Sequence, residues 1–150
     1  MKHTIPFYGT VNASSTNTFV SKLINFPYTT DEIRIKFALG HEATVKHRIM
    51  ISDDDAAPTS GQGSGDSLLK AYGHVDYVVG DDDVMILKEE TAVVRRGTYI
   101  KVNCVNSDTA NHTVNVVITI DDMLIHSGKQ KILDILEKAG LPIELKIGQE

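Results

Sequence analysis

The chain has 150 residues, of which 41% are hydrophobic and 23% charged, and its formal net charge is −5 at neutral pH. This length fits one domain, and the composition excludes a disordered chain, which would be poorer in apolar residues. The fifteen basic residues form no run longer than Arg95 and Arg96, which argues against direct binding to nucleic acid.

The first part of the chain alternates apolar and polar residues, the pattern of half-buried strands. Early strands are predicted over residues 4–11 and 18–26, and the first is an edge strand or an arm because Pro6 cannot donate to a ladder. The alternation is clearest over residues 31–39 and returns over 44–52. The short joint between these two runs predicts that they form a hairpin.

Two more hairpins are predicted further along the chain. Residues 52–66 (SDDDAAPTSGQGSGD) have almost nothing to bury and should form the longest loop. Ordered segments are predicted over 68–79 and 84–94, and the turn between them predicts a hairpin. Residues 98–105 and 112–120 alternate on either side of a polar turn and predict the clearest hairpin.

Together these segments predict a mainly β protein, an antiparallel sandwich or jelly roll of about eight strands. The C-terminal part changes character, because Ser127 and Gln130 fit a capping box and apolar residues then recur at helical spacing. A helix is therefore expected over 128–139, followed by a short extended tail. We predict a sandwich domain at 1–126, with the helix and tail of 127–150 packed on it or on a neighbour.

The single cysteine, Cys104, excludes an intrachain disulfide framework and is expected to be a buried strand thiol. The N-terminal segment lacks the apolar region of a signal peptide, and no stretch has the length of a membrane span. We therefore expect synthesis in the cytoplasm and no membrane partner.

No catalytic motif emerges from the sequence. The six histidines, at positions 3, 41, 47, 74, 112 and 126, are scattered, and most should lie on the surface or in turns. The glycine-rich stretch at 61–66 lacks the ending of a P-loop, and Ser64 is not in a nucleophile elbow. We therefore predict a protein that is not an enzyme, with no catalytic residue, cofactor or metal ligand.

Three acidic turns leave a binding role open: Asp53–Asp55, Asp81–Asp83 and Asp121–Asp122. If they converged at one end of the sandwich, their carboxylates could bind calcium. Consecutive aspartates are also ordinary in turns, where they oppose edge-to-edge association. Aromatic residues total 6% with no tryptophan, which weakens a carbohydrate-binding interpretation.

Two stretches, FPYTTDEIRIKFALGHEATVKHRIMISDDDAAPTSG and RRGTYIKVNCVNSDTANHTVNVVITID, resemble the strand-loop-strand units of small jelly-roll or tulip-like sandwiches among tailed-phage virion proteins, especially head decoration proteins. The resemblance covers somewhat under half of the chain and includes no diagnostic motif. It implies a structural subunit of a virion, a homo-oligomer with a trimer favoured, which holds a capsid protein or another assembly protein through its terminal segments.

The terminal segments supply the candidate assembly contacts, because extended termini can add to a sheet edge. These contacts are Ile5, Phe7, Tyr8, Ile132, Leu136, Ile143, Leu145 and Ile147. Both termini could instead fold back onto their own domain. A virion structural protein is thus the leading expectation, located in the virion or, if not viral, in the cytoplasm; a carbohydrate- or calcium-binding module is the alternative.

Overall fold

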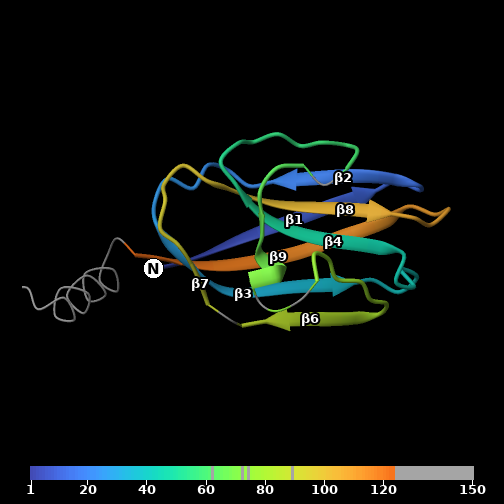
Figure 1. Ribbon diagram of the computed structural model, residues 1–150. Helices are drawn as coiled ribbons and strands as arrows, with labels where there is room; N and C mark the ends of the chain where they lie inside the picture. Colours follow the sequence, from blue (N-terminus) through green and yellow to red (C-terminus); the bar gives the residue numbers. More distant parts are fainter. Residues whose placement is uncertain (62, 72, 74, 89, 124–150) are drawn as a thin grey trace, which may run out of the picture.

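The computed structural model describes residues 1–61, 63–71, 73, 75–88 and 90–123 (Figure 1). The described chain is mainly β and forms two antiparallel sheets that pack face to face, which confirms the predicted sandwich. The helix expected over 128–139, the tail after it and the proposed boundary at residue 126 lie outside the described residues.

Each sheet is four strands wide. In the first, the order is β1 (Lys2–Val11), β9 (His112–Asp122), β3 (Tyr28–Phe37) and β6 (Asp83–Leu87), and β7 (Thr91–Val93) also pairs with β3. In the second, the order is β2 (Ser15–Val20), β8 (Tyr99–Asn106), β4 (Val45–Ser52) and β5 (Asp66–Ser67). A single turn of helix, α1 (Leu68–Ala71), follows β5 and was not predicted.

The strand order is that of a jelly roll. The chain alternates between the sheets from β1 to β4, and it alternates again from β7 through β8 to β9. If β6 and β7 are taken as one interrupted strand beside β3, eight strands lie in two sheets of four. This arrangement is the double-sheet architecture of jelly rolls, which brings β1 and β9, the first and last strands of the described residues, side by side.

All three predicted hairpins are wrong, two of them because successive strands lie in opposite sheets. The strands β3 and β4, which follow each other around residues 38–44, lie in opposite sheets, and so do β8 and β9. Residues 68–79 contain α1 rather than a strand partner for β6. An alternating pattern says which side chains face the core, but a short joint can connect neighbours in one sheet or arch across to the other.

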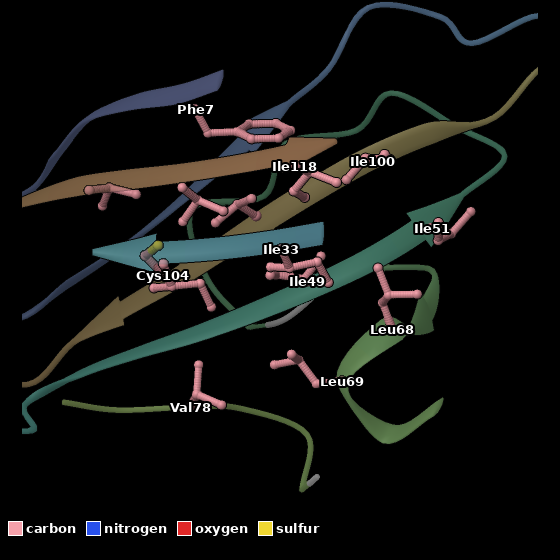
Figure 2. Close-up of a cluster of buried hydrophobic side chains, with 14 of the residues drawn as sticks. Phe7, Ile33, Ile49, Ile51, Leu68, Leu69, Val78, Ile100, Cys104 and Ile118 are labelled. Atoms are coloured by element: carbon pink, nitrogen blue, oxygen red, sulfur yellow. The ribbon is translucent and has the colours of Figure 1, made fainter. Parts of the chain in front are cut away.

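The core is a layer of aliphatic side chains between the sheets. Figure 2 shows Ile33 and Ile118 from the first sheet with Ile49 and Ile100 from the second. These four side chains are fully shielded from solvent. Leu68 and Leu69 of α1 are also buried here, so the short helix closes one margin of the core. Cys104 is buried as predicted, and burial raises the pKa of its thiol to about 12.

The long loop between β4 and β5 covers the outer face of the second sheet. Lys101 and Asn103 are on the face of β8 that alternation predicts to be in water, yet both are buried. The amide of Asn103 donates to Thr18 Oγ1 at 2.9 Å and to the carbonyl of Gly61 at 3.1 Å. Thr18 in turn donates to the carbonyl of Pro58 at 2.7 Å. Polar side chains of the sheet therefore anchor the loop, and Figure 1 shows its path.

The outer strands β1 and β2 meet at one corner of the sandwich. A Cβ atom built on Gly9 would lie 2.3 Å from Cε1 of the Phe19 ring. The side-chain amide of Asn17 donates to the carbonyl of Thr10 at 3.2 Å, next to this contact. The absence of a side chain at Gly9 therefore lets the edges of the two sheets approach each other.

Replacement of Gly9 by valine should destabilise the protein, because the ring of Phe19 must move to admit the new side chain. Such overpacking should lower the free energy of unfolding by about 1–3 kcal/mol, which urea denaturation can measure. Phe19→Ala provides the control. In the double variant the ring is absent, so Gly9→Val should lower the free energy of unfolding by less than it does in the unmodified protein. An equal cost in both backgrounds would show that the contact is not responsible.

Candidate functional site

An apolar groove opens where β1 and β2 separate beyond the contact of Gly9 with Phe19. It has a volume of about 560 Å³ and lies between the first half of β1 and the segment that leaves β2. Residues 3–7 of β1 line one side and residues 20–24 line the other, with Phe26 and Ile120 completing it. The groove thus follows the open side of the sandwich, where both sheets end.

The lining of the groove is mostly hydrophobic. Phe7 and Ile24 are core residues, whereas Ile5 and Phe26 are only partly buried and pack against the core from the groove side. Leu23 is on the rim with 52% of its surface exposed. A groove of this kind suits apolar side chains of a polypeptide better than a polar ligand.

One end of the groove is polar and is held in place by contacts between the N-terminus and the end of β9. His3 lies against Phe26 with ring centroids 5.1 Å apart, and its Nε2 is 2.9 Å from Asp122 Oδ2. The N-terminal amine is 3.2 Å from Asp121 Oδ1. The backbone N–H of Met123 donates to the carbonyl of Pro27 at 3.0 Å. The chain therefore leaves the described domain beside this end of the groove.

The candidate contacts of β1 fall in different places. All ten residues of β1 pair with β9, so the N-terminal segment is folded onto its own domain and is an edge strand rather than an arm. Ile5 and Phe7 come together in the groove, and Phe7 is 4% exposed because it also belongs to the core. Tyr8 is 64% exposed and does not line the groove. The contacts proposed at Ile132, Leu136, Ile143, Leu145 and Ile147 lie outside the described residues.

Sequence reasoning missed the other wall of the groove. Leu23, Ile24 and Phe26 were included in a strand predicted over 18–26, but β2 ends at Val20. Pro27 follows this segment and therefore gave no signal that the strand ends at Val20.

The first acidic turn is engaged by basic side chains. Lys101, whose side chain is fully buried, donates from Nζ to Asp54 Oδ1 at 2.7 Å. Asp54 also accepts from Ser64 Oγ at 2.6 Å and from the backbone N–H of Ala56 at 3.0 Å. These hydrogen bonds, that of Lys101 foremost, hold the pKa of the Asp54 carboxyl well below its usual range. Arg95 donates from Nε to Asp53 Oδ1 at 2.8 Å.

The three acidic turns do not converge. Tyr28, at the start of β3, pairs with Asp122, whereas Phe37, at its end, pairs with Asp83. These two turns are therefore separated by the ten residues of β3, about 30 Å at the usual rise of a strand. The described residues contain no group of three or more His, Cys, Asp or Glu side chains that could hold a metal ion. The geometry gives no support to a calcium site shared by these turns.

Asp54→Ala should destabilise the protein more than Lys101→Met. The first change leaves a buried ammonium group without its carboxylate, whereas the second removes the charge and keeps most of the apolar stem. Thermal unfolding of the two variants tests this order. Asp55→Ala, which alters a neighbouring exposed acid, should behave like the unmodified protein; a larger loss in Lys101→Met than in Asp54→Ala would contradict the argument.

Three histidines form a buried cluster at the end of the sandwich opposite the polar end of the groove. We had expected most histidines to lie on the surface or in turns. His41 and His47 are fully buried, and His112 is 9% exposed. The ring of His41 stacks on that of His47 with centroids 6.1 Å apart and meets that of His112 at 4.9 Å. His47 alternates inward with Val45 and Ile49 on β4, which was visible in the sequence, but the approach of His41 and His112 was not.

Burial sets the charge state of this cluster. Desolvation lowers the pKa of His47 to about 4 and also lowers the pKa of His41, to which nearby His112 adds. His41 Nδ1 and His47 Nε2 have no hydrogen-bond partner among the described residues. His112 lies with its Nε2 at 2.8 Å from Asp108 Oδ2. His41 and His47 therefore act as neutral core residues near pH 7.

The free energy of unfolding should fall as the pH drops from about 6.5 to about 4. His47 takes up a proton near 6.5 when unfolded but only near pH 4 when folded, so the unfolded state binds more protons in this window and acid favours it. The pKa difference corresponds to about 3 kcal/mol at most, because each pKa unit is worth about 1.4 kcal/mol.

Urea denaturation between pH 7.5 and 4 measures this effect. His47→Leu should flatten the fall, since leucine fills the site without titrating, whereas His3→Leu changes a partly exposed histidine far from the cluster and should retain it. A fall of the same size in His47→Leu would assign the acid sensitivity to other groups.

Comparisons with known proteins leave the chain without a family. No family model and no curated protein matches the sequence. Two solved structures align at low similarity, those of infectious bursal disease virus Gx strain (TM-score 0.37, 12% identity) and Gt strain (TM-score 0.34, 12% identity). The alignments cover 84% and 81% of this chain, which spans about a third, 33%, of each matched viral chain. At these TM-scores the likeness supports no functional argument.

A search for membrane-spanning helices gives one further result. Among the described residues, no helix is long and apolar enough to cross a membrane.

Proposed function

We propose that this protein is a non-enzymatic structural subunit of a protein assembly, and specifically a decoration or stabilising subunit on the surface of a virion. Its partners are other copies of itself, in a trimer, and a capsid or other assembly protein. The observation that supports the role most directly is the apolar groove on the open side of the sandwich, beside Met123, the last described residue.

The architecture is suited to this role. Jelly-roll sandwiches are used in viral capsids as well as in lectins, because two packed sheets make a stiff unit with edges available for contact. The virion context rests on the resemblance of the two segments at 26–61 and 95–121 to tailed-phage head decoration proteins.

The occupant proposed for the groove is the C-terminal segment of a neighbouring copy. That segment carries apolar residues at helical and then alternating spacing, among them Ile132, Leu136 and Ile143. Because β9 is antiparallel to β1, the groove extends from Met123 back along β9, against the direction in which the chain runs there. A segment that comes from a neighbouring copy is not bound to this direction.

Light scattering of the full chain tests this contact. Leu136→Glu in the segment and Leu23→Glu on the groove rim should each remove every species of three or more chains, because each places a charge in the same apolar contact. Leu39→Glu is the matched control, since Leu39 is 79% exposed and lies away from the groove. A species of three or more chains that survives both variants, or a chain that forms no such species before mutation, would contradict the proposed contact.

Electron microscopy of particles that contain this chain tests the virion role separately. Density for the sandwich on an outer lattice is the expected result. Localisation of the chain away from any particle or filament would overturn the structural role, whatever the oligomeric state in solution.

A carbohydrate-binding role remains the second candidate, and one observation favours it. On the other side of the contact between Gly9 and Phe19 from the apolar groove, there is an open hollow of about 690 Å³. Hydroxyl and amide side chains line it, including Thr10, Asn12 and Asn17. Such groups are suited to hydrogen bonds with sugar hydroxyls. Binding on a glycan array that Asn17→Ala abolishes would support this role over the first.

A further inference from the structure

The strand β6 leaves one edge of the first sheet open. It pairs with β3 from Asp83 to Leu87, and no other strand of the described chain pairs with it on the far side (Figure 1). Its sequence, DVMIL, contains four consecutive apolar residues. Edge strands usually carry a charge, a proline or a bulge that prevents pairing with another chain, and these four positions have none.

The backbone of β6 shows which groups face the open edge. The N–H of Val84 donates to Oδ1 of Asp83 at 2.7 Å, so it is not used in the ladder with β3. Because backbone groups of successive residues point to opposite sides of a strand, those of Val84 and Ile86 face outward while those of Met85 face β3. The open edge therefore presents the N–H of Ile86 and the carbonyls of Val84 and Ile86, while the N–H of Val84 is held by Asp83 Oδ1.

The side chains of the same residues form an exposed apolar strip. Val84 and Ile86 are 44% and 45% exposed on the outer face of the first sheet. Met85 and Leu87 point to the other face and are partly buried against the core. Association through the edge would thus bury apolar surface on one face and extend the core on the other.

We propose that β6 pairs with β6 of a second copy of this chain, antiparallel and with Met85 at the two-fold axis. In this register Val84 of one copy lies opposite Ile86 of the other, and the outward N–H and carbonyl groups of these pairs bond to one another once the N–H of Val84 exchanges Asp83 Oδ1 for the carbonyl of the second copy. The side chains of Val84 and Ile86 then lie on the same face of one continuous sheet.

Charge complementarity selects the second copy as the partner and favours this register. The acidic residues Asp82 and Asp83 precede the apolar strip, and Lys88 follows it. An antiparallel pair centred on Met85 brings the turn at Asp82, which has a φ of 45°, near Lys88 of the other copy, whose Nζ lies 4.0 Å from Glu32 Oε1 within its own chain. A shift of the axis by one residue to Ile86 would place Val84 opposite Lys88 and lose this pairing. The contact is isologous, as two-fold interfaces are.

This contact is independent of the groove and of the C-terminal segment. It produces pairs of chains rather than trimers, so in a virion lattice it would connect neighbouring oligomers. Its test can therefore fail while the proposed structural role stands.

Sedimentation velocity of the full chain with Leu136→Glu, which removes the contact proposed for the groove, tests the edge contact. This protein should be a dimer at tens of micromolar, and adding Ile86→Lys should make it monomeric, because the charge and its hydration oppose strand pairing. Leu39→Lys, an exposed apolar residue in a loop, is the matched control and should leave the dimer intact. A dimer that persists with Ile86→Lys, or a monomer without it, would overturn the edge contact.

Cysteine cross-linking in the otherwise unmodified chain tests the register. Val84→Cys with Ile86→Cys should give a disulfide-linked dimer on mild oxidation, because each new thiol lies opposite the other residue in the second copy. Either single variant should cross-link at least tenfold less, and the native Cys104 is buried and should not interfere. Equal cross-linking by the single variants would exclude the axis at Met85.

A loss of the β6 dimer with retention of particle binding in electron microscopy would refute only this inference. Absence of the chain from any assembly, with the β6 dimer intact, would refute the virion role and leave the edge contact standing.

Discussion

The sandwich depends on one shared layer of aliphatic side chains, because neither sheet can shield its apolar face from water alone. The strands that are central in the two sheets contribute equally to this layer, for example Ile33 from β3 and Ile100 from β8. The jelly-roll order places successive strands on opposite sides of the layer, so most short connections cross it at its ends. The core, the arrangement of the edges and the groove all follow from this single constraint.

Polar burial around the core is organised by specific partners. The long loop after β4 can lie on the second sheet because Asn103, Thr18 and Lys101 supply hydrogen bonds to it. At the far end of the molecule, His41 and His47 are buried with ring nitrogens that have no partner among the described residues, so they are tolerated as neutral rings only. One polar cluster therefore holds a buried positive charge through a carboxylate, whereas the other disfavours charge.

Association is governed by the edges of the two sheets. On one side, β1 and β2 touch at Gly9 and then separate, which leaves an apolar groove at the chain exit. On the other side, β6 presents a short apolar edge with acidic residues before it and a lysine after it. The proposed assembly uses both sides of the same rigid sandwich, and a unit with two separate contact regions can extend into a lattice where a unit with one cannot.

The sequence by itself determined the mainly β class, the inward faces of β3, β4, β8 and β9, and the burial of Cys104, because the two-residue period of a strand is a local property. It also indicated Ile5 and Phe7, two members of the groove. Only the tertiary structure decided which sheet each strand joins, and with it the failure of the predicted hairpins, the burial of Lys101 beneath a polar loop and the meeting of His41 with His112. These features join residues far apart in the chain, and side-chain alternation carries no information about which distant segment covers a given face.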